Sequence, residues 1–525
     1  WTLNFWIKRA AIEGSNPVSS ARTLTVFNPR SGTSGSVLHE FLFGATGSYG
    51  AGDAFAITNT NTGAYILSTN NVFRDVTSWY NIHIQADLDN GTASEKLKIF
   101  INGTEANYNV DNRSSYSSMA GIVAGAWTIG DYYNYGYPIQ SYLAQWAYVD
   151  GSTLAPTVFS EEKNGVWIPK DLSSGITWGS AGHLLMFQDS SNLGDDTSGE
   201  GNDWSSSNLS AHDQMLDNPS GHNYCTLNPL NNVNSGTLSE GNLKATAGNW
   251  TAVYSTFEVP VTGSWYWEYI SENHVYGYPG VQTTTTQANQ QNHDFVAVQT
   301  GEYRYEGTGE ANTSSIGTGD IIGFHVNNGV IKVYVNNSLD HTFGTNMASS
   351  TNASKPFFPS HIGSSAGKFN FGADSSFQGA KTAQGNGGDG EDFYYSPPSG
   401  AKALSSANLA IVAEVDPAQT DDDYPSKLFG SVRYTGNNGT QELTLGFQAD
   451  LIWPRDRRYG QDWYWVDSSR GLTGSNGVFI KSNSNVVEAD FPQDNFTAVS
   501  STTITVSGGT WFNSGTHSMN IKAWR

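Results

Sequence analysis

Cysteine is almost absent from this chain of 525 residues, and its absence limits both covalent and metal chemistry. Cys225 is the single cysteine, so the chain can form no internal disulfide and no cysteine-based zinc site. Extracellular proteins of this size that mature in an oxidising compartment usually carry disulfides. We therefore expect a protein that is made in a reducing cytoplasm and works outside the cell, with Cys225 packed rather than reactive.

Charged residues and long apolar runs are also scarce. Charged residues make up 14% of the chain, and 26 basic residues stand against 48 acidic ones, for a net charge of −22. A nucleic-acid groove needs clustered lysine and arginine, and no such run occurs. No stretch of about 18 apolar residues is present to span a bilayer. We predict no nucleic-acid partner and no membrane insertion.

Aromatic residues and glycine are abundant instead, with 16 Trp, 26 Tyr, 25 Phe and 57 Gly. Disordered chains are poor in aromatics, whereas short strands joined by Gly, Asn and Ser turns give this profile. Leu97–Gly103 runs from a strand pattern into an Asn-Gly turn, a strong hairpin pattern. Short helices are expected only around Ala155–Glu162. The predicted fold class is all-β, as several β-sandwiches.

Changes in composition divide the chain into four segments. Residues 1–213 hold many strand patterns and a polar C-terminal extension, and residues 224–377 hold a second set. Residues 378–406 are rich in Gly, Pro and Ser and predict a linker or an extended arm. Residues 407–525 are a β-rich module of undetermined topology. Because the chain opens on a strand pattern at Trp1–Lys8, without a signal peptide, we expect it to be part of a longer protein.

Two regions resemble known sandwich families. Trp1–Arg9, Trp79–Ile84 and the hairpin Leu97–Gly103 resemble laminin-G-like, or concanavalin A-like, jelly rolls. The second region has W-Y-W-E from Trp265, then G-D-I-I-G from Gly319, and later I-x-V-Y-x-N and N-F-G. This order resembles a SPRY (B30.2-like) sandwich. The resemblance implies a module that binds proteins through loops at one rim.

A longer string of motifs resembles tail-fibre and appendage proteins of marine bacterial viruses, including cyanophages. Its parts are Gly165–Lys170, Gly201–Trp204, Cys225–Pro229, Phe447–Trp453 and Asp467–Gly471. The C-terminal part departs from the usual pattern, since Ala449 replaces a proline. The resemblance implies a non-enzymatic virion appendage protein, a tail fibre or surface fibre, that mediates host-surface adhesion.

That resemblance also implies partners and a location. We expect a virion-surface or extracellular protein that contacts other virion proteins and forms a homo-oligomer, with a trimer as the guessed form. The expected target is a host cell-surface glycan or protein. The sequence contains no coiled-coil heptads that would establish a trimer.

Aromatic clusters are the candidate ligand-binding residues. Tyr132, Tyr133, Tyr135 and Tyr137 follow one another in a loop spaced by Asn and Gly, and residues without periodicity cannot all point inward. We expect this loop to face a glycan, another module or another subunit. The densest cluster contains Trp463 and Trp465. Exposed aromatic rings are rigid contact anchors for proteins and sugars.

No catalytic residue is predicted. The metalloprotease, P-loop, nucleophile-elbow and dinucleotide fingerprints are all missing from the sequence. Jelly-roll glycosidases place two carboxylates on one strand face. Glu268 and Glu272 have the right parity, but Ile270 lies between them at the end of the strand pattern. His83 lies in a strand pattern, where a core or surface role is favoured over metal binding.

Calcium is the one cofactor that the acidic loops leave open, and no other is expected. Calcium takes about six to eight oxygen ligands. Three clusters could supply some of them: Asp87, Asp89 and Asn90; Asp195, Asp196, Glu200 and Asp203; and Asp421–Asp423. Solvated turn residues are the favoured interpretation of each cluster, so the metal site is unknown.

Three other functions remain open from the sequence. The first is a structural protein, a capsid-decoration or tail-assembly component whose aromatic loops contact neighbouring subunits. The second is a polysaccharide-degrading enzyme on the jelly-roll scaffold. The third is a secreted bacterial lectin or adhesin, which would need a signal peptide before Trp1.

Overall fold

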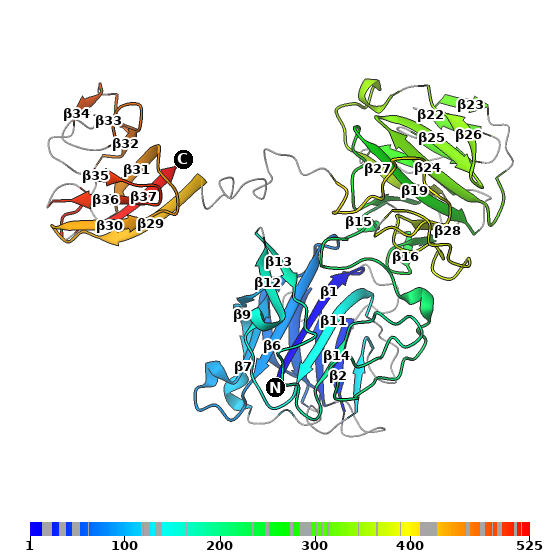
Figure 1. The fold of residues 1–525 in the computed structure, drawn as a ribbon, viewed down its shortest axis with the longest axis horizontal. Helices are drawn as coiled ribbons and strands as arrows, with labels where there is room; N and C mark the ends of the chain where they lie inside the picture. Colours follow the sequence, from blue (N-terminus) through cyan, green and yellow to red (C-terminus); the bar gives the residue numbers. More distant parts are fainter. Residues whose placement is uncertain are drawn as a thin grey trace. The chain divides into compact units, whose positions relative to one another are not determined.

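The computed structural model consists almost wholly of β-strands, which confirms the predicted all-β class of several sandwiches (Figure 1). Among the described residues the helical elements are α1 (Pro156–Phe159), where a short helix was expected, and the 3-10 turns η1 (Ala93–Glu95), η2 (Arg113–Ser115), η3 (Ala211–Asp213) and η4 (Met347–Ser349). No helix in the described part is long and apolar enough to cross a bilayer.

The structure describes residues 1–12, 24–30, 38–44, 53–60, 62–116, 119, 126–131, 139–163, 165–233, 236–246, 251–272, 277–283, 296–299, 302–305, 308–311, 316–344, 346–363, 366–388, 390–409, 428–457, 462–472, 478–485, 487–490, 496–508, 512–515 and 517–525. These residues divide into two compact units. One comprises residues 1–161 and 167–409, and the other comprises residues 162–166 and 410–525.

The first unit begins with a sandwich of two six-stranded sheets that share one core. The strand order of one sheet is β14 (His183–Leu185), β11 (Ser141–Val149), β1 (Thr2–Arg9), β6 (Trp79–Ala86), β7 (Leu97–Ile101) and β8 (Thr104–Glu105). The order of the other is β10 (Trp127–Ile129), β2 (Leu24–Pro29), β3 (His39–Phe43), β4 (Ala54–Asn59), β5 (Ala64–Val72) and β9 (Tyr108–Asp111). A small hairpin joins β12 (Ser160–Lys163) and β13 (Val166–Pro169).

Strand β1 shows how the sequence pattern relates to burial. Its alternate residues Leu3, Phe5 and Ile7 enter the core, as a strand pattern predicts. The polar residues between them are buried as well, because segments that follow β11 fold across the outer face of the sheet. The Thr2 hydroxyl, for example, donates to the Ser152 carbonyl over 2.9 Å.

A second sandwich completes the first unit, with two seven-stranded sheets around one core. One sheet has the order β15 (Leu227–Val233), β18 (Thr251–Ser255), β27 (Phe357–Gly363), β20 (Gly277–Thr283), β21 (Val296–Gln299), β22 (Glu302–Tyr305) and β23 (Thr308–Ala311). The other has the order β16 (Thr237–Ser239), β17 (Lys244–Thr246), β28 (Ala366–Asn370), β19 (Ser264–Ser271), β24 (Ile321–Asn327), β25 (Val330–Val335) and β26 (Ser338–Thr342).

Residues 378–406, predicted to be a linker, fold back onto the second sandwich instead. Phe393 is fully buried. The backbone N–H groups of Tyr394 and Tyr395 each donate over 2.8 Å to Glu268 on β19. The linker prediction was wrong because composition reveals only local properties. The backbone N–H groups of this Gly-rich segment bind a buried carboxylate, Glu268, that is distant in sequence.

The second unit supplies the topology that the sequence left open for its C-terminal region. A six-stranded sheet has the order β29 (Phe429–Thr435), β37 (Ser518–Trp524), β31 (Leu451–Asp456), β32 (Tyr464–Asp467), β33 (Val478–Lys481) and β34 (Ala489–Asp490). A three-stranded sheet has the order β30 (Thr440–Thr444), β36 (Thr503–Ser507) and β35 (Phe496–Val499). Apolar residues of both sheets form a common core.

Candidate functional site

The outer face of the six-stranded sheet in the second unit carries large side chains at alternate positions. On β31, buried residues alternate with Leu451, Trp453 and Arg455, which are at least partly exposed. Strand β37 alternates in the same way and presents Asn520 and Lys522. Since successive side chains on a strand point to opposite faces, these five residues share the face that lies away from the core.

Three tryptophan rings meet on this face. Strand pairing places Lys522 of β37 directly opposite Trp453 of β31. On its other side β31 pairs with β32, and this pairing brings Trp465 beside Trp453. The ring centroid of Trp453 lies 5.8 Å from that of Trp463 and 6.3 Å from that of Trp465. Trp465 is 42% exposed, a large fraction for so large an apolar side chain.

Two basic side chains lie over the rings. The guanidinium carbon of Arg455 is 4.4 Å from the centroid of Trp463, and Lys522 Nζ is 5.2 Å from the centroid of Trp453. Both distances allow cation–π attraction. Within the described part of the chain, neither side chain forms an ion pair with a carboxylate. We call Trp453, Trp463, Trp465, Arg455 and Lys522 the tryptophan face.

The carboxylates at the ends of β32 are matched by other cations. Asp462 Oδ2 lies 2.6 Å from Lys481 Nζ, and this hydrogen bond lowers the pKa of Asp462. Burial acts to raise the pKa of Asp467, but hydrogen bonds from Ser469 and Arg470 outweigh it, and the net shift is downward. Both acids therefore stay ionised and paired, and they do not neutralise the tryptophan face.

Sequence reasoning identified part of this site. Trp463 and Trp465 were predicted as ligand-binding residues, and the structure brings them together on one face. Trp453 and the two cations were missed. The alternation of Trp453 and Arg455 on one strand pattern was a local indication of an exposed face, but Lys522 joins it only through long-range strand pairing. The predicted Tyr132, Tyr133, Tyr135 and Tyr137 lie outside the described residues.

The carboxylate considered for catalysis serves as an anchor. Glu268 is fully buried and accepts four hydrogen bonds, two from the backbone of residues 394 and 395, one from Asn370 Nδ2 at 3.1 Å and one from the Tyr266 hydroxyl at 3.2 Å. Burial raises its pKa to about 7. Glu272, its proposed neighbour, lies 2.6 Å from Lys244 Nζ. Each carboxylate is thus held by other groups of the protein.

The acidic loops considered for calcium are engaged in turns. Asp87 Oδ2 accepts a hydrogen bond from Asn90, and Asp196 accepts backbone N–H groups of Leu184 and Ser198. No group of three or more His, Cys, Asp or Glu residues in the described ranges is arranged to hold a metal ion. The third cluster, residues 421–423, lies outside the described residues.

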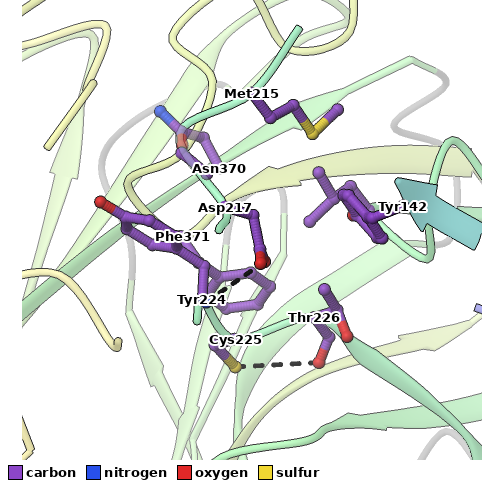
Figure 2. Close-up of a pocket in the computed structure, with 10 residues that line it drawn as sticks. Tyr142, Met215, Asp217, Tyr224, Cys225, Thr226, Asn370 and Phe371 are labelled. Carbon is purple, nitrogen blue, oxygen red and sulfur yellow. Dashed lines mark hydrogen bonds between the residues drawn. The ribbon is translucent and has the colours of Figure 1, made fainter. Parts of the chain in front are cut away.

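A small cavity lies where the two sandwiches of the first unit meet. Figure 2 shows the residues that line it, among them Tyr142 from β11 and Asp217, Tyr224 and Cys225 from the segment that enters the second sandwich. Its volume is about 10 Å³, room for about one water molecule. Burial raises the pKa of the Cys225 thiol to about 11, so this cysteine is packed, as predicted.

His83 is also a core group rather than a ligand. It is fully buried on β6, and its Nε2 lies 3.0 Å from the Leu154 carbonyl oxygen. Burial lowers its pKa to about 4, so the ring is neutral near pH 7. Its contacts are those of a hydrogen-bonded core residue, as the strand pattern favoured.

Comparisons with known families and structures add little on function. A domain of unknown function, DUF7483, matches residues 424–525, the part that contains the tryptophan face. The match covers less than half of the chain. No curated protein matches the sequence.

The solved structures that are similar to part of the chain include the following three. The SPRY domain of human HERC1 has 13% identity and a TM-score of 0.24, covering 27% of this chain and 96% of that one. The TRIM65 PSpry domain has 15% identity and a TM-score of 0.22, covering 28% and 89%. Stonustoxin has 15% identity and a TM-score of 0.22, covering 28% of each chain. Two of these structures are SPRY domains, the sandwich class that the W-Y-W-E region resembles, but likenesses this weak carry no argument about binding.

Proposed function

We propose that this protein is a non-enzymatic appendage subunit that attaches a viral particle to the surface of its host cell. The tryptophan face is the observation that supports this proposal best. Three rings on a sheet, one of them 42% exposed, form a rigid apolar surface with charged groups beside it. Such surfaces bind sugar rings and protein partners with little loss of conformational entropy.

The β-sandwich scaffold suits this role. A face built on strands keeps its side chains in fixed positions, which reduces the cost of ordering them on binding. We propose that several copies act together on the virion surface, as a homo-oligomer that contacts other virion proteins. Linked copies raise the overall avidity by a factor of about 10² to 10⁴ without any new contact.

The first prediction concerns binding to cells. We expect labelled full-length protein to bind candidate host cells saturably, and Trp465→Ala to weaken this binding at least about fivefold, because stacking on a ring contributes about 1 kcal/mol. Leu339→Ala is the matched control, since Leu339 is also exposed, at 55%, but belongs to β26 of the second sandwich. Flow cytometry on host and non-host cells measures both.

Periodate-treated and protease-treated cells separate the two kinds of target. Loss of binding after periodate indicates a glycan, and loss after protease indicates a surface protein. If properly assembled protein binds neither host cells nor their extracted surface, adhesion is wrong. The tryptophan face would then be a contact between subunits, as in the structural alternative.

A further inference from the structure

Charge is distributed unevenly along this chain. Residues 424–525 contain nine basic and eight acidic residues, whereas the whole chain contains 26 and 48. The segment that carries the tryptophan face is therefore close to neutral within a strongly acidic protein. Since the acidic remainder repels polyanions, a polyanion can bind only where basic groups are gathered on one surface.

Three cations whose side chains are at least partly exposed gather on the sheet that carries the tryptophan face. Strand pairing sets Arg433 of β29 and Arg455 of β31 on either side of Asn520, in one row across three strands. Lys522 lies two residues further along β37, about 7 Å away at the usual rise of a strand. No described carboxylate forms an ion pair with these three cations.

Resting on the proposed function, we infer that the glycan bound by the tryptophan face is an acidic polysaccharide that bears carboxylate or sulfate groups. Trp465 is the stacking platform for a sugar ring, because no described cation lies over it and it is the most exposed of the three rings. Arg455 and Lys522, already held against Trp463 and Trp453, bind the acidic groups. Arg433 extends the basic row toward the sheet edge.

A glycan fits this surface better than a single-stranded nucleic acid. Proteins that bind single strands stack successive bases on several exposed rings along a basic groove. Here cations lie over two of the three rings, and among the described residues no cation lies over Trp465. One ring beside separate cations matches a chain of sugars in which acidic groups project from the rings.

The test compares polymers that differ in charge alone. Full-length protein is titrated with polygalacturonate and its fully methyl-esterified form, with dextran sulfate and dextran, and with a thymidine oligonucleotide. We expect the acidic member of each polysaccharide pair to bind at least about tenfold more tightly than its neutral partner. The affinity should fall as salt is raised, because the contacts are solvent-exposed and screened. Carboxylate and sulfate arms show which acid is preferred.

Two double variants assign the effect to the face. Arg455→Gln with Lys522→Gln should weaken binding of the acidic polymers about tenfold and leave the neutral ones unchanged. Lys332→Gln with Lys402→Gln removes two positive charges from side chains of the first unit that are at least partly exposed, and should have little effect. Arg455→Lys with Lys522→Arg keeps the charge and should restore most of the affinity, which shows that the fold is intact.

The outcomes separate this inference from the proposed function. Equal affinity for acidic and neutral polymers, reduced by Trp465→Ala, would overturn the inference and leave glycan adhesion standing. Equal losses of affinity for the acidic polymers in the two glutamine double variants would also overturn the inference, since the attraction would then come from the charge of the whole protein and not from the tryptophan face. Tighter binding of the oligonucleotide than of any polysaccharide would replace it with a nucleic-acid site. Binding of no polymer, together with no binding to cells, would contradict the proposed function itself.

Discussion

Glu268 is a fully buried carboxyl group, and two opposing effects set its ionisation. Removing a carboxylate from water raises its pKa, and here burial is the larger effect. The four donors around it act in the other direction, because hydrogen bonds to a carboxylate favour the charged form. The balance places its pKa at about 7, well above the ordinary value for glutamate.

We predict that Glu268→Gln changes how stability depends on pH. The folded-state pKa of about 7 exceeds the unfolded value near 4.5, so the folded protein binds more protons between those values. The contribution of Glu268 is fully present below the unfolded pKa and is lost as pH rises through about 7. Relative to Glu268→Gln, the wild type should therefore become less stable from about pH 5 to pH 8. Urea unfolding of both proteins measures this difference.

At low pH the Glu268→Gln variant should also be less stable than the wild type, by about 1–3 kcal/mol. The reason is that the amide N–H₂ of the glutamine would face backbone N–H groups, so that two donors oppose each other. Glu272→Gln is the matched control, because Glu272 is partly exposed and paired with Lys244. If the wild type instead gains stability relative to Glu268→Gln as pH rises, the four hydrogen-bond donors, and not burial, set the direction of the pKa shift of Glu268.

At the scale of a single element, the hairpin between β7 and β8 depends on a glycine for two reasons. Asn102 and Gly103 have φ values of 46° and 77°, which match the two-residue turn that an Asn-Gly pair favours. A Cβ on Gly103 would also lie 2.7 Å from the ring of Trp167. That ring is held in place by a hydrogen bond of 3.0 Å from its Nε1 to Asn81 Oδ1.

We predict that Gly103→Ala lowers the free energy of unfolding by about 2–3 kcal/mol, from backbone strain and the clash together. Gly63→Ala is the matched control, since Gly63 has φ of 67° with open space around it, and should cost only about 1 kcal/mol. Thermal unfolding compares the two variants. Equal losses would show that Trp167 moves aside freely and does not brace the hairpin.

Elements set by neighbouring residues could be predicted from the sequence, whereas contacts between distant residues could not. Strands such as β1 and the turn at Asn102 depend on neighbouring residues, so alternation and turn chemistry were sufficient to predict them. Residues 378–406 were mistaken for a linker because their partner, Glu268, lies far away in the chain. The tryptophan face was predicted only in part for the same reason, since Lys522 reaches Trp453 through pairing between distant strands.

At the scale of the molecule, polar contacts join the two sandwiches of the first unit. Lys8 on β1 is buried, and its Nζ donates to Asp217 Oδ2 and Asn223 Oδ1, each over 2.7 Å, and to the Tyr224 carbonyl over 2.9 Å. The indole N–H of Trp79 donates to the other oxygen of Asp217 over 2.8 Å. Asp217 lies on the segment between the sandwiches, so these bonds fix that segment to the first sheet.

Further bonds reach the second sandwich directly. The Tyr142 hydroxyl donates to the Gly241 carbonyl over 2.7 Å, and Asn242 Nδ2 donates to the Ala10 carbonyl over 2.6 Å. Removing one partner of a buried hydrogen bond costs more stability than the intact bond contributes, because the remaining group stays buried and unpaired. The two sandwiches should therefore unfold together in the wild type.

We predict that Lys8→Met uncouples the two sandwiches. Removing the ammonium leaves Asp217 buried without its counter-charge, which should cost about 3–5 kcal/mol. Scanning calorimetry should then resolve two transitions within the first unit where the wild type shows one. Lys8→Met with Asp217→Asn should recover part of the loss, because the neutral amide no longer needs a counter-charge.

Lys98→Met is the control, because it removes a more exposed partner of Glu95. It should shift the transition little and leave it single. A single transition in Lys8→Met would mean that apolar contacts and the remaining hydrogen bonds couple the sandwiches without the buried ion pair.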